Sequence, residues 1–216
     1  MAYNLNDKLV IAISSRALFD LEEENQIFEK DGLDAYYKYQ LENEDKSLKK
    51  GTGYRLVENI LKINSFFSSD ERQVEVIILS KNNAATSLRI TNAINDLKLD
   101  IIRSAWTSGT NISNYLKAFK VDLFLSADDN DVLNAIENGV AAAKILHSNE
   151  NIHNISNEQV RIAFDGDAVL FSEESELVYK NHGLEAFIEH EKENRNNPLE
   201  MGPFAKLLLT IAKIQA

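Results

Sequence analysis

The chain lacks features that several classes of protein require. Its 216 residues contain no cysteine, which excludes disulfides, zinc–thiolate sites and cysteine nucleophiles and favours a reducing cytoplasm. No apolar run approaches the roughly 20 residues that span a membrane, and residues 1–10 lack the basic and apolar regions of a secretory signal. The four histidines do not show metal-ligand spacing. We therefore expect a cytoplasmic protein without a membrane partner.

Positive charge is also scarce. Lys and Arg together number 23 against 34 Asp and Glu, so the formal net charge is −11. Proteins that bind nucleic-acid polymers usually carry a basic stripe, and this sequence shows none, so we expect no such partner. A small anionic ligand would need local positive potential from a metal ion or from helix N-termini.

Two carboxylates stand together after a short apolar segment. Residues 162–164 are apolar, and the segment 161–164 predicts a buried strand, which leads into Asp165, Gly166 and Asp167. Open α/β sheets bind ligands at the carboxyl ends of their strands, and the glycine lets the backbone turn and a ligand approach. One carboxylate could attack phosphorus, the other could transfer a proton, and both could bind Mg²⁺. The alternative is a solvated turn after the strand.

The string AFDGDAVLFSEESE, residues 163–176, resembles the cytosolic 5′-nucleotidase I family of the haloacid-dehalogenase-like (HAD-like) phosphatases, whose first motif is Asp-x-Asp-x-Val. Further strings that match this family, in chain order, are residues 13–28, 108–119 and 122–132. The resemblance implies Mg²⁺-dependent hydrolysis of nucleoside 5′-monophosphates through an aspartyl-phosphate intermediate. It also implies that Asp165 is the nucleophile, that Asp167 is the acid and base, and that both bind the metal.

An internal repeat relates the two ends of the chain. Residues 11–64 align without a gap with residues 162–215, at an offset of 162 − 11 = 151. Glycines recur at matched positions, as Gly32 and Gly183 and as Gly51 and Gly202. The second copy stops before any counterpart of the later strands, so we expect weak or no activity from this chain alone.

The first copy has lost the acidic pair. Ser14 stands at the position of Asp165, and Arg16 stands at the position of Asp167. A serine is a poorer metal ligand than a carboxylate, and an arginine repels a metal ion. Arg16 is instead a candidate to bind a phosphate or an acidic partner.

Other residues of the first copy are weaker candidates for the site. Ser80 follows a buried strand, where the resembled phosphatases place a phosphate-binding Ser or Thr, and a turn that caps the next helix is the alternative. Lys117 is a second substrate-binding candidate. Asp128 and Asp129 begin or cap helix 130–138, with metal binding as the alternative interpretation.

Apolar periodicity predicts alternating strands and helices over the first two-thirds of the chain. We expect strands at 8–13, 74–79, 100–106, 122–126 and 141–147, and helices at 21–30, 33–44, 85–97, 112–119 and 130–138. A further helix is expected to open at residues 51–53 and to carry apolar residues on one face up to residue 63. This alternation predicts an α/β fold, a parallel, doubly wound, Rossmann-like or HAD-like sheet with helices on both faces. An incomplete second copy of the same unit follows it. The expected divisions are 1–147, a linker at 148–158, and 159–216.

The sequence leaves more than one class of function open. The first is a 5′-nucleotidase, with Mg²⁺ as cofactor and a nucleoside monophosphate as substrate. The second is a non-catalytic nucleotide-binding or assembly module, and a phospho-receiver domain fits less well because the acidic pair is Asp-x-Asp. A central strand at 160–165 without partners would recruit another chain or dock on the first copy. We therefore expect a homo-oligomer.

Overall fold

The computed structural model describes residues 4–147 and 160–215. The chain divides into two compact units, Met1–Val160 (unit 1) and Arg161–Ala216 (unit 2). The linker predicted at 148–158 lies outside the described residues.

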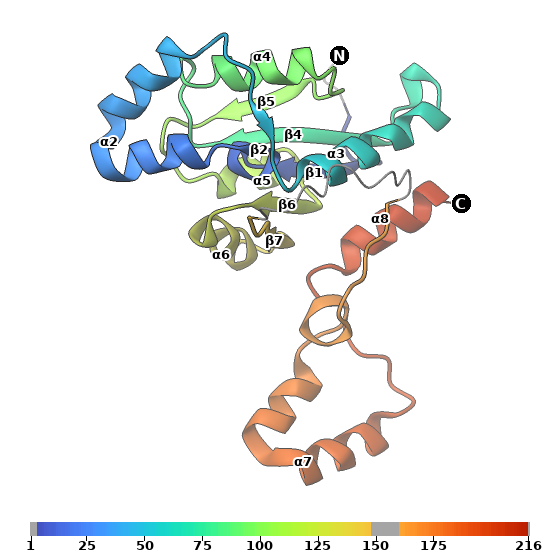
Figure 1. Ribbon diagram of the computed structural model, residues 1–216. Helices are drawn as coiled ribbons and strands as arrows, with labels where there is room; N and C mark the ends of the chain where they lie inside the picture. Colours follow the sequence, from blue (N-terminus) through green and yellow to red (C-terminus); the bar gives the residue numbers. More distant parts are fainter. Residues whose placement is uncertain (1–3, 148–159, 216) are drawn as a thin grey trace. The chain divides into compact units, whose positions relative to one another are not determined.

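Unit 1 is built on a five-stranded sheet (Figure 1). Its strands are β1 (Leu9–Ile13), β4 (Val74–Ser80), β5 (Arg103–Trp106), β6 (Leu123–Ser126) and β7 (Ala142–Lys144). They lie in the order β5-β4-β1-β6-β7, and every neighbouring pair is parallel. The central strand β1 pairs Ile11 with Val76 on one side and with Leu123 on the other. The predicted parallel α/β fold is confirmed.

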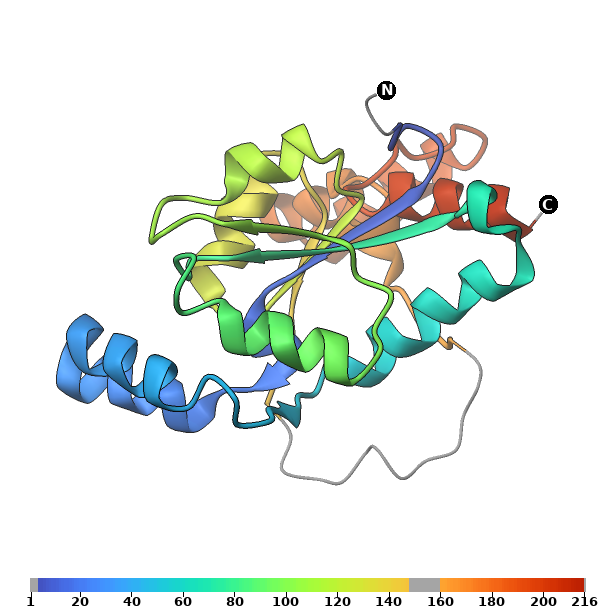
Figure 2. The same ribbon diagram turned by 90° about the horizontal axis from the view of Figure 1, so that it is seen from above.

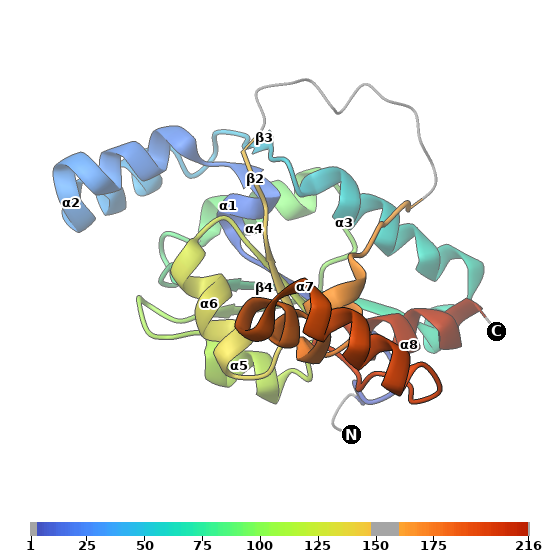
Figure 3. The ribbon, with the colours of Figure 1, turned by 90° about the horizontal axis from the view of Figure 1, so that it is seen from below.

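Helices cover both faces of this sheet. They are α1 (Ser15–Leu18), α2 (Glu22–Glu42), α3 (Tyr54–Leu61), α4 (Leu88–Asp96), α5 (Ser113–Ala118) and α6 (Asp129–Glu137), with short 3₁₀ helices η1 (Lys62–Phe66) and η2 (Ser69–Glu71). Figures 2 and 3 show α3 and α4 on one side of the strands and α5 and α6 on the other. The strand order therefore reverses direction between β1 and β6, and this is the place where doubly wound sheets bind ligands.

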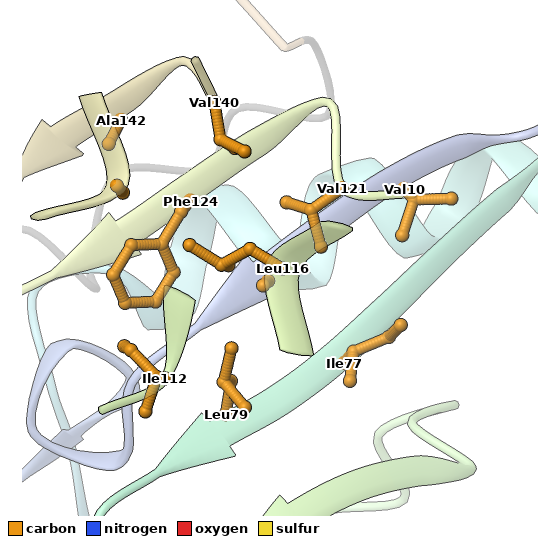
Figure 4. Close-up of a cluster of buried hydrophobic side chains, with 11 residues drawn as sticks. Val10, Ile77, Leu79, Ile112, Leu116, Val121, Phe124, Val140 and Ala142 are labelled. Carbon is orange, nitrogen blue, oxygen red and sulfur yellow. The ribbon is translucent and has the colours of Figure 1, made fainter. Parts of the chain in front are cut away.

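The central strands of unit 1 are continuous apolar runs in the sequence because they form the core of the unit. All residues of β1 and β4 are buried, as expected for parallel strands that are covered on both faces. On the α5 side, Phe124 packs against Ile112, the N-cap of that helix, and Leu116 within it (Figure 4). Burying such a ring and its neighbours stabilises the fold by about 1.5–3 kcal/mol for each side chain.

A short hairpin with a long inserted helix lies between β1 and α3 in the chain. Strands β2 (Phe19–Asp20) and β3 (Lys49–Lys50) pair antiparallel, and α2 is inserted between them. Helix α2 breaks at Gly32, whose φ of 84° and ψ of −176° are not helical. The prediction of two helical segments that meet at Gly32 is thus confirmed, whereas the short β2–β3 hairpin was not predicted.

Unit 2 contains helices α7 (Glu174–Asn194) and α8 (Ala205–Gln215) and a tight turn over Gly166–Leu170. The predicted strand at 160–165 is wrong, because among the described residues this segment pairs with no other strand. A strand obtains its hydrogen bonds from neighbouring strands. Strand β1 receives them from β4 and β6, and the described part of unit 2 has no equivalent of either.

The helices of the two units share one further property. Within residues 4–147 and 160–215, none combines the length and the apolar content that crossing a bilayer requires.

Candidate functional site

The acidic pair lies in a tight, exposed turn of unit 2. Asp165 precedes the turn with extended backbone, and its Oδ1 accepts the N–H of Gly166 at 2.7 Å. The N–H of Phe171 donates to the carbonyl of Gly166 at 3.0 Å and closes the turn. Within it, Ala168 adopts a left-handed conformation with φ of 58°, which is costly for a residue other than glycine. Both carboxylates, Asp165 and Asp167, are exposed and accessible to a ligand.

A second segment of unit 2 holds this turn in place. Gly202 donates its N–H to the carbonyl of Leu170 at 2.8 Å, and Phe204 donates to that of Val169 at 3.0 Å. A Cβ at position 202 would lie 2.4 Å from the carbonyl oxygen of Phe171. Only glycine allows the two backbones to approach this closely, so Gly202, three residues before α8, fixes the position of the acidic turn.

Unit 1 shows a similar construction at the end of β1. Ser14, like Asp165, precedes a helical turn with extended backbone, and its Oγ accepts the N–H of Ala17 at 3.4 Å. Gly51 donates to the carbonyl of Leu18 at 2.9 Å, and a Cβ there would lie 2.8 Å from the same oxygen. The turn of unit 1 therefore depends on a glycine in the same way, but it carries no carboxylate at position 14.

The helices that follow the two turns also match. The corresponding glycines and aromatic pairs are Gly32 and Gly183, and Phe28–Tyr36 and Tyr179–Phe187. The glycines have φ of 84° and 82°, the ring centroids lie 5.9 and 6.1 Å apart, and the interplanar angles are 79° and 82°. On these correspondences we propose that residues 162–215 repeat residues 11–64.

Ser80 and Ser15 lie together at the carboxyl edge of the sheet of unit 1. Their hydroxyl oxygens are 3.1 Å apart and buried. Ser80 does not itself cap α4, which begins after Ser87. Its Oγ accepts the N–H of Asn82 at 3.4 Å, and Oδ1 of Asn83 accepts the N–H of Thr86 at 2.9 Å, so the Ser/Asn turn of the alternative interpretation is present. Ser15 was not predicted as part of the site, although a hydroxyl two residues after the end of β1 was a usable signal.

The acidic candidates at the start of α6 already have partners. Asp128 is the N-cap of α6 and accepts the N–H of Asp131 at 3.0 Å, which confirms the capping interpretation. Asp129 pairs with Lys144 at 2.7 Å, and Asp131 pairs with Lys81 at 2.6 Å. Burial raises the pKa of Asp131 above its ordinary value of 3.8, although the nearby Lys81 ammonium opposes the shift.

Lys117 lies away from these groups. It is exposed in the last turn of α5, and the chain then enters β6, where Asp122 donates its N–H to the carbonyl of Val10 near the start of β1. Lys117 thus lies at the amino edge of the sheet, whereas Ser80 ends β4 at the carboxyl edge. The structure does not bring these two candidates together.

The donor set at the acidic turn suits Mg²⁺. The ion favours oxygen ligands, and proteins often hold it with one or two carboxylates while waters and substrate phosphates complete the shell. Asp165 and Asp167 supply two such carboxylates. In the described ranges no group of three or more His, Cys, Asp or Glu side chains could hold a metal ion, so a metal at this turn would depend on additional ligands.

Comparison with known proteins gives a consistent result over the whole chain. The family model described as 5′-nucleotidase matches residues 1–216. Human cytosolic 5′-nucleotidase 1B is 34% identical over 211 residues, which cover 96% of this chain and 34% of the human protein. The chain thus spans about a third of the length of this curated relative.

Proposed function

The chain belongs to the 5′-nucleotidase family, and from this premise we propose that it forms part of an enzyme that hydrolyses nucleoside 5′-monophosphates. The observation that carries the proposal is the exposed turn that presents Asp165 and Asp167 two residues apart. Its position beside Gly202, which leaves no room for a side chain, indicates that the turn is held in a defined shape.

In the proposed reaction, a carboxylate oxygen of Asp165 attacks the phosphorus atom of the substrate. The bond from phosphorus to the ribose 5′-oxygen breaks, and Asp167, as a carboxylic acid, donates its proton to that leaving oxygen. Water then attacks the phosphorus of the aspartyl-phosphate, Asp167 accepts the proton, and phosphate leaves Asp165. The Gly166 N–H that binds Oδ1 at 2.7 Å orients the nucleophile. Mg²⁺ held by the two carboxylates would offset the negative charge of the phosphate.

Unit 1 is proposed to have a non-catalytic role. Ser14 and Arg16 occupy the two positions that carry aspartates in unit 2, and a guanidinium cannot act as the acid of this mechanism. This difference supports the alternative of a binding or assembly function for unit 1.

A cytosolic location and self-assembly complete the proposal. The name of the human relative describes it as cytosolic, and the net charge of −11 disfavours a nucleic-acid partner. Helix α2 exposes Phe28, Leu33 and Tyr37. Apolar groups exposed together often mark an interface, and a second copy of the chain is the proposed partner.

Release of phosphate from AMP by the whole enzyme of which this chain is proposed to form part, with and without Mg²⁺, tests the catalytic proposal. Asp165→Asn keeps the side-chain volume but removes the nucleophile, and we expect turnover to fall by about 10³-fold or more. Asp167→Asn should lower it by about 10²–10⁴-fold. Ser14→Ala is the matched control in unit 1 and should stay within about twofold of wild type. Wild-type turnover in Asp165→Asn would exclude the proposed nucleophile.

A further inference from the structure

A cavity of about 310 Å³ opens beside the sheet of unit 1. Its walls come from four separate segments, which are the residues after β1, the loop between β3 and α3, the residue after β6, and the end of β7 with the residues that follow it. Polar or charged side chains that line it are Arg16, Asp20, Glu22, Thr52, Lys144 and His147. The cavity therefore lies at the carboxyl edge where the strand order reverses, and doubly wound sheets bind small molecules there.

Two cations, Arg16 and Lys144, line this cavity beside two carboxylates, although the chain as a whole carries a charge of −11. Arg16 meets Glu22 at 3.7 Å, and the two side chains are 37% and 46% exposed. So long and exposed an ion pair contributes little to stability. The guanidinium can therefore exchange Glu22 for a phosphate, whose oxygens it can bind through two parallel hydrogen bonds.

The remaining lining groups indicate what kind of molecule would carry the phosphate. Lys144 adds a second cation, which already pairs with Asp129 at 2.7 Å. Phe19 and Leu21 supply apolar surface, and Asp20 supplies a carboxylate that can accept hydrogen bonds from hydroxyl groups. A volume of about 310 Å³ is in the range of small-ligand pockets.

We propose that this cavity is a second site, which binds a small phosphate monoester bearing hydroxyl groups and does not cleave it. Arg16 and Lys144 bind the phosphate, and Asp20 accepts from the hydroxyls. Arg16 stands 151 positions before Asp167, since 16 + 151 = 167. The position that carries a proton donor in the proposed catalytic turn thus carries an anion-binding group in unit 1. The proposal does not depend on the chemistry of Asp165.

Calorimetric titration of the whole chain tests this site. The parent protein carries Asp165→Asn and Asp167→Asn and is held in EDTA, so that turnover and metal binding do not contribute. The probes are inorganic phosphate, ribose 5-phosphate and AMP, with adenosine as the probe that lacks phosphate. We expect the two esters to bind more tightly than phosphate and to weaken as salt is raised, since the contacts are partly exposed.

Variants then locate the binding. Arg16→Gln and Lys144→Gln should each weaken AMP by about 10- to 100-fold, the effect of losing a charge-assisted hydrogen bond. Lys38→Gln is the matched control, because Lys38 is also an exposed lysine paired with a carboxylate, that of Glu42. It should bind AMP within about twofold of the parent. Circular dichroism confirms that each variant is folded.

Glu22→Gln is expected to tighten the binding of inorganic phosphate, and such a gain of affinity cannot result from a damaged fold. The change removes the carboxylate that competes for Arg16. Affinities of Arg16→Gln and Lys144→Gln within twofold of the parent, or no phosphate-dependent binding of any probe, would overturn the proposal. Esters that bind no more tightly than inorganic phosphate would overturn the assignment of Asp20.

Discussion

Arg89 of α4 offers a sharp test of how α2 is held on unit 1. Its Nη1 lies 2.5 Å from Oε1 of Glu24, and the two side chains are only 5% and 6% exposed. Arg89 also donates to Gln40 at 3.4 Å and to the carbonyl of Lys46 at 2.9 Å. A single guanidinium thus joins both halves of α2, and the segment after it, to α4.

Arg89→Met should remove these bonds and leave the Glu24 carboxylate buried without its cation. Breaking a buried pair by deleting one partner costs about 3–5 kcal/mol. For a domain of this size each kcal/mol shifts the melting temperature by about 2–4 °C, so the expected decrease is roughly 6–20 °C. Trp106, the one tryptophan of the chain, lies in β5, and its fluorescence during urea unfolding reports on unit 1.

The double variant Arg89→Met, Glu24→Met controls for the loss of the charge. Replacing both partners with apolar groups removes the unpaired carboxylate, so the double variant should be more stable than Arg89→Met alone. A cost below about 1 kcal/mol for Arg89→Met, or a double variant that is less stable than the single one, would refute the reasoning.

Three further changes test other parts of the account. Burial raises the pKa of Asp131, so above pH 3.8 the folded state retains a proton that the unfolded state has lost, and stability falls as pH rises through that window. Asp131→Asn should remove this part of the pH dependence of urea unfolding, and an unchanged slope would contradict it. Gly202→Ala places a Cβ 2.4 Å from the carbonyl of Phe171 and should destabilise the acidic turn by about 1–3 kcal/mol. Gly166→Ala is its control, since its nearest contact would be an ordinary 3.8 Å, and equal hydrogen-exchange rates at Phe171 in the two variants would be inconsistent with the crowding argument. Leu33 is 62% exposed, so Leu33→Asp should leave the far-UV circular dichroism unchanged but lower the mass measured by light scattering, and a monomeric wild type would oppose the assembly proposal.

The sequence predicts the sheet of unit 1 well because its central strands are buried on both faces. Residues such as Ile11 and Ile77 stand in apolar runs that only a covered parallel strand explains. The same reasoning fails at Ile162, which is identical to Ile11 in the alignment and is 44% exposed. A local run of apolar and β-prone residues indicates a preference for extended backbone. A strand also requires neighbouring strands, which come from elsewhere in the chain.

Some features of the candidate site could likewise be predicted from the sequence, and others could not. The Asp165 turn and the Asp128 cap were predictable, because their hydrogen bonds join residues within a few positions of one another. The Arg89–Glu24 pair joins residues 65 positions apart, and four segments build the cavity of unit 1. Neither leaves a periodic signal in the sequence, since tertiary packing alone brings the groups together.

Covalent labelling tests the central claim most directly. The protein is mixed with AMP that carries radioactive phosphorus, quenched in acid during turnover, and digested into peptides. If Asp165 is the nucleophile, label should appear on the peptide that contains residues 161–171, and hydroxylamine should release it as expected for an acyl phosphate. Turnover without labelled protein, or label retained in Asp165→Asn, would contradict the account.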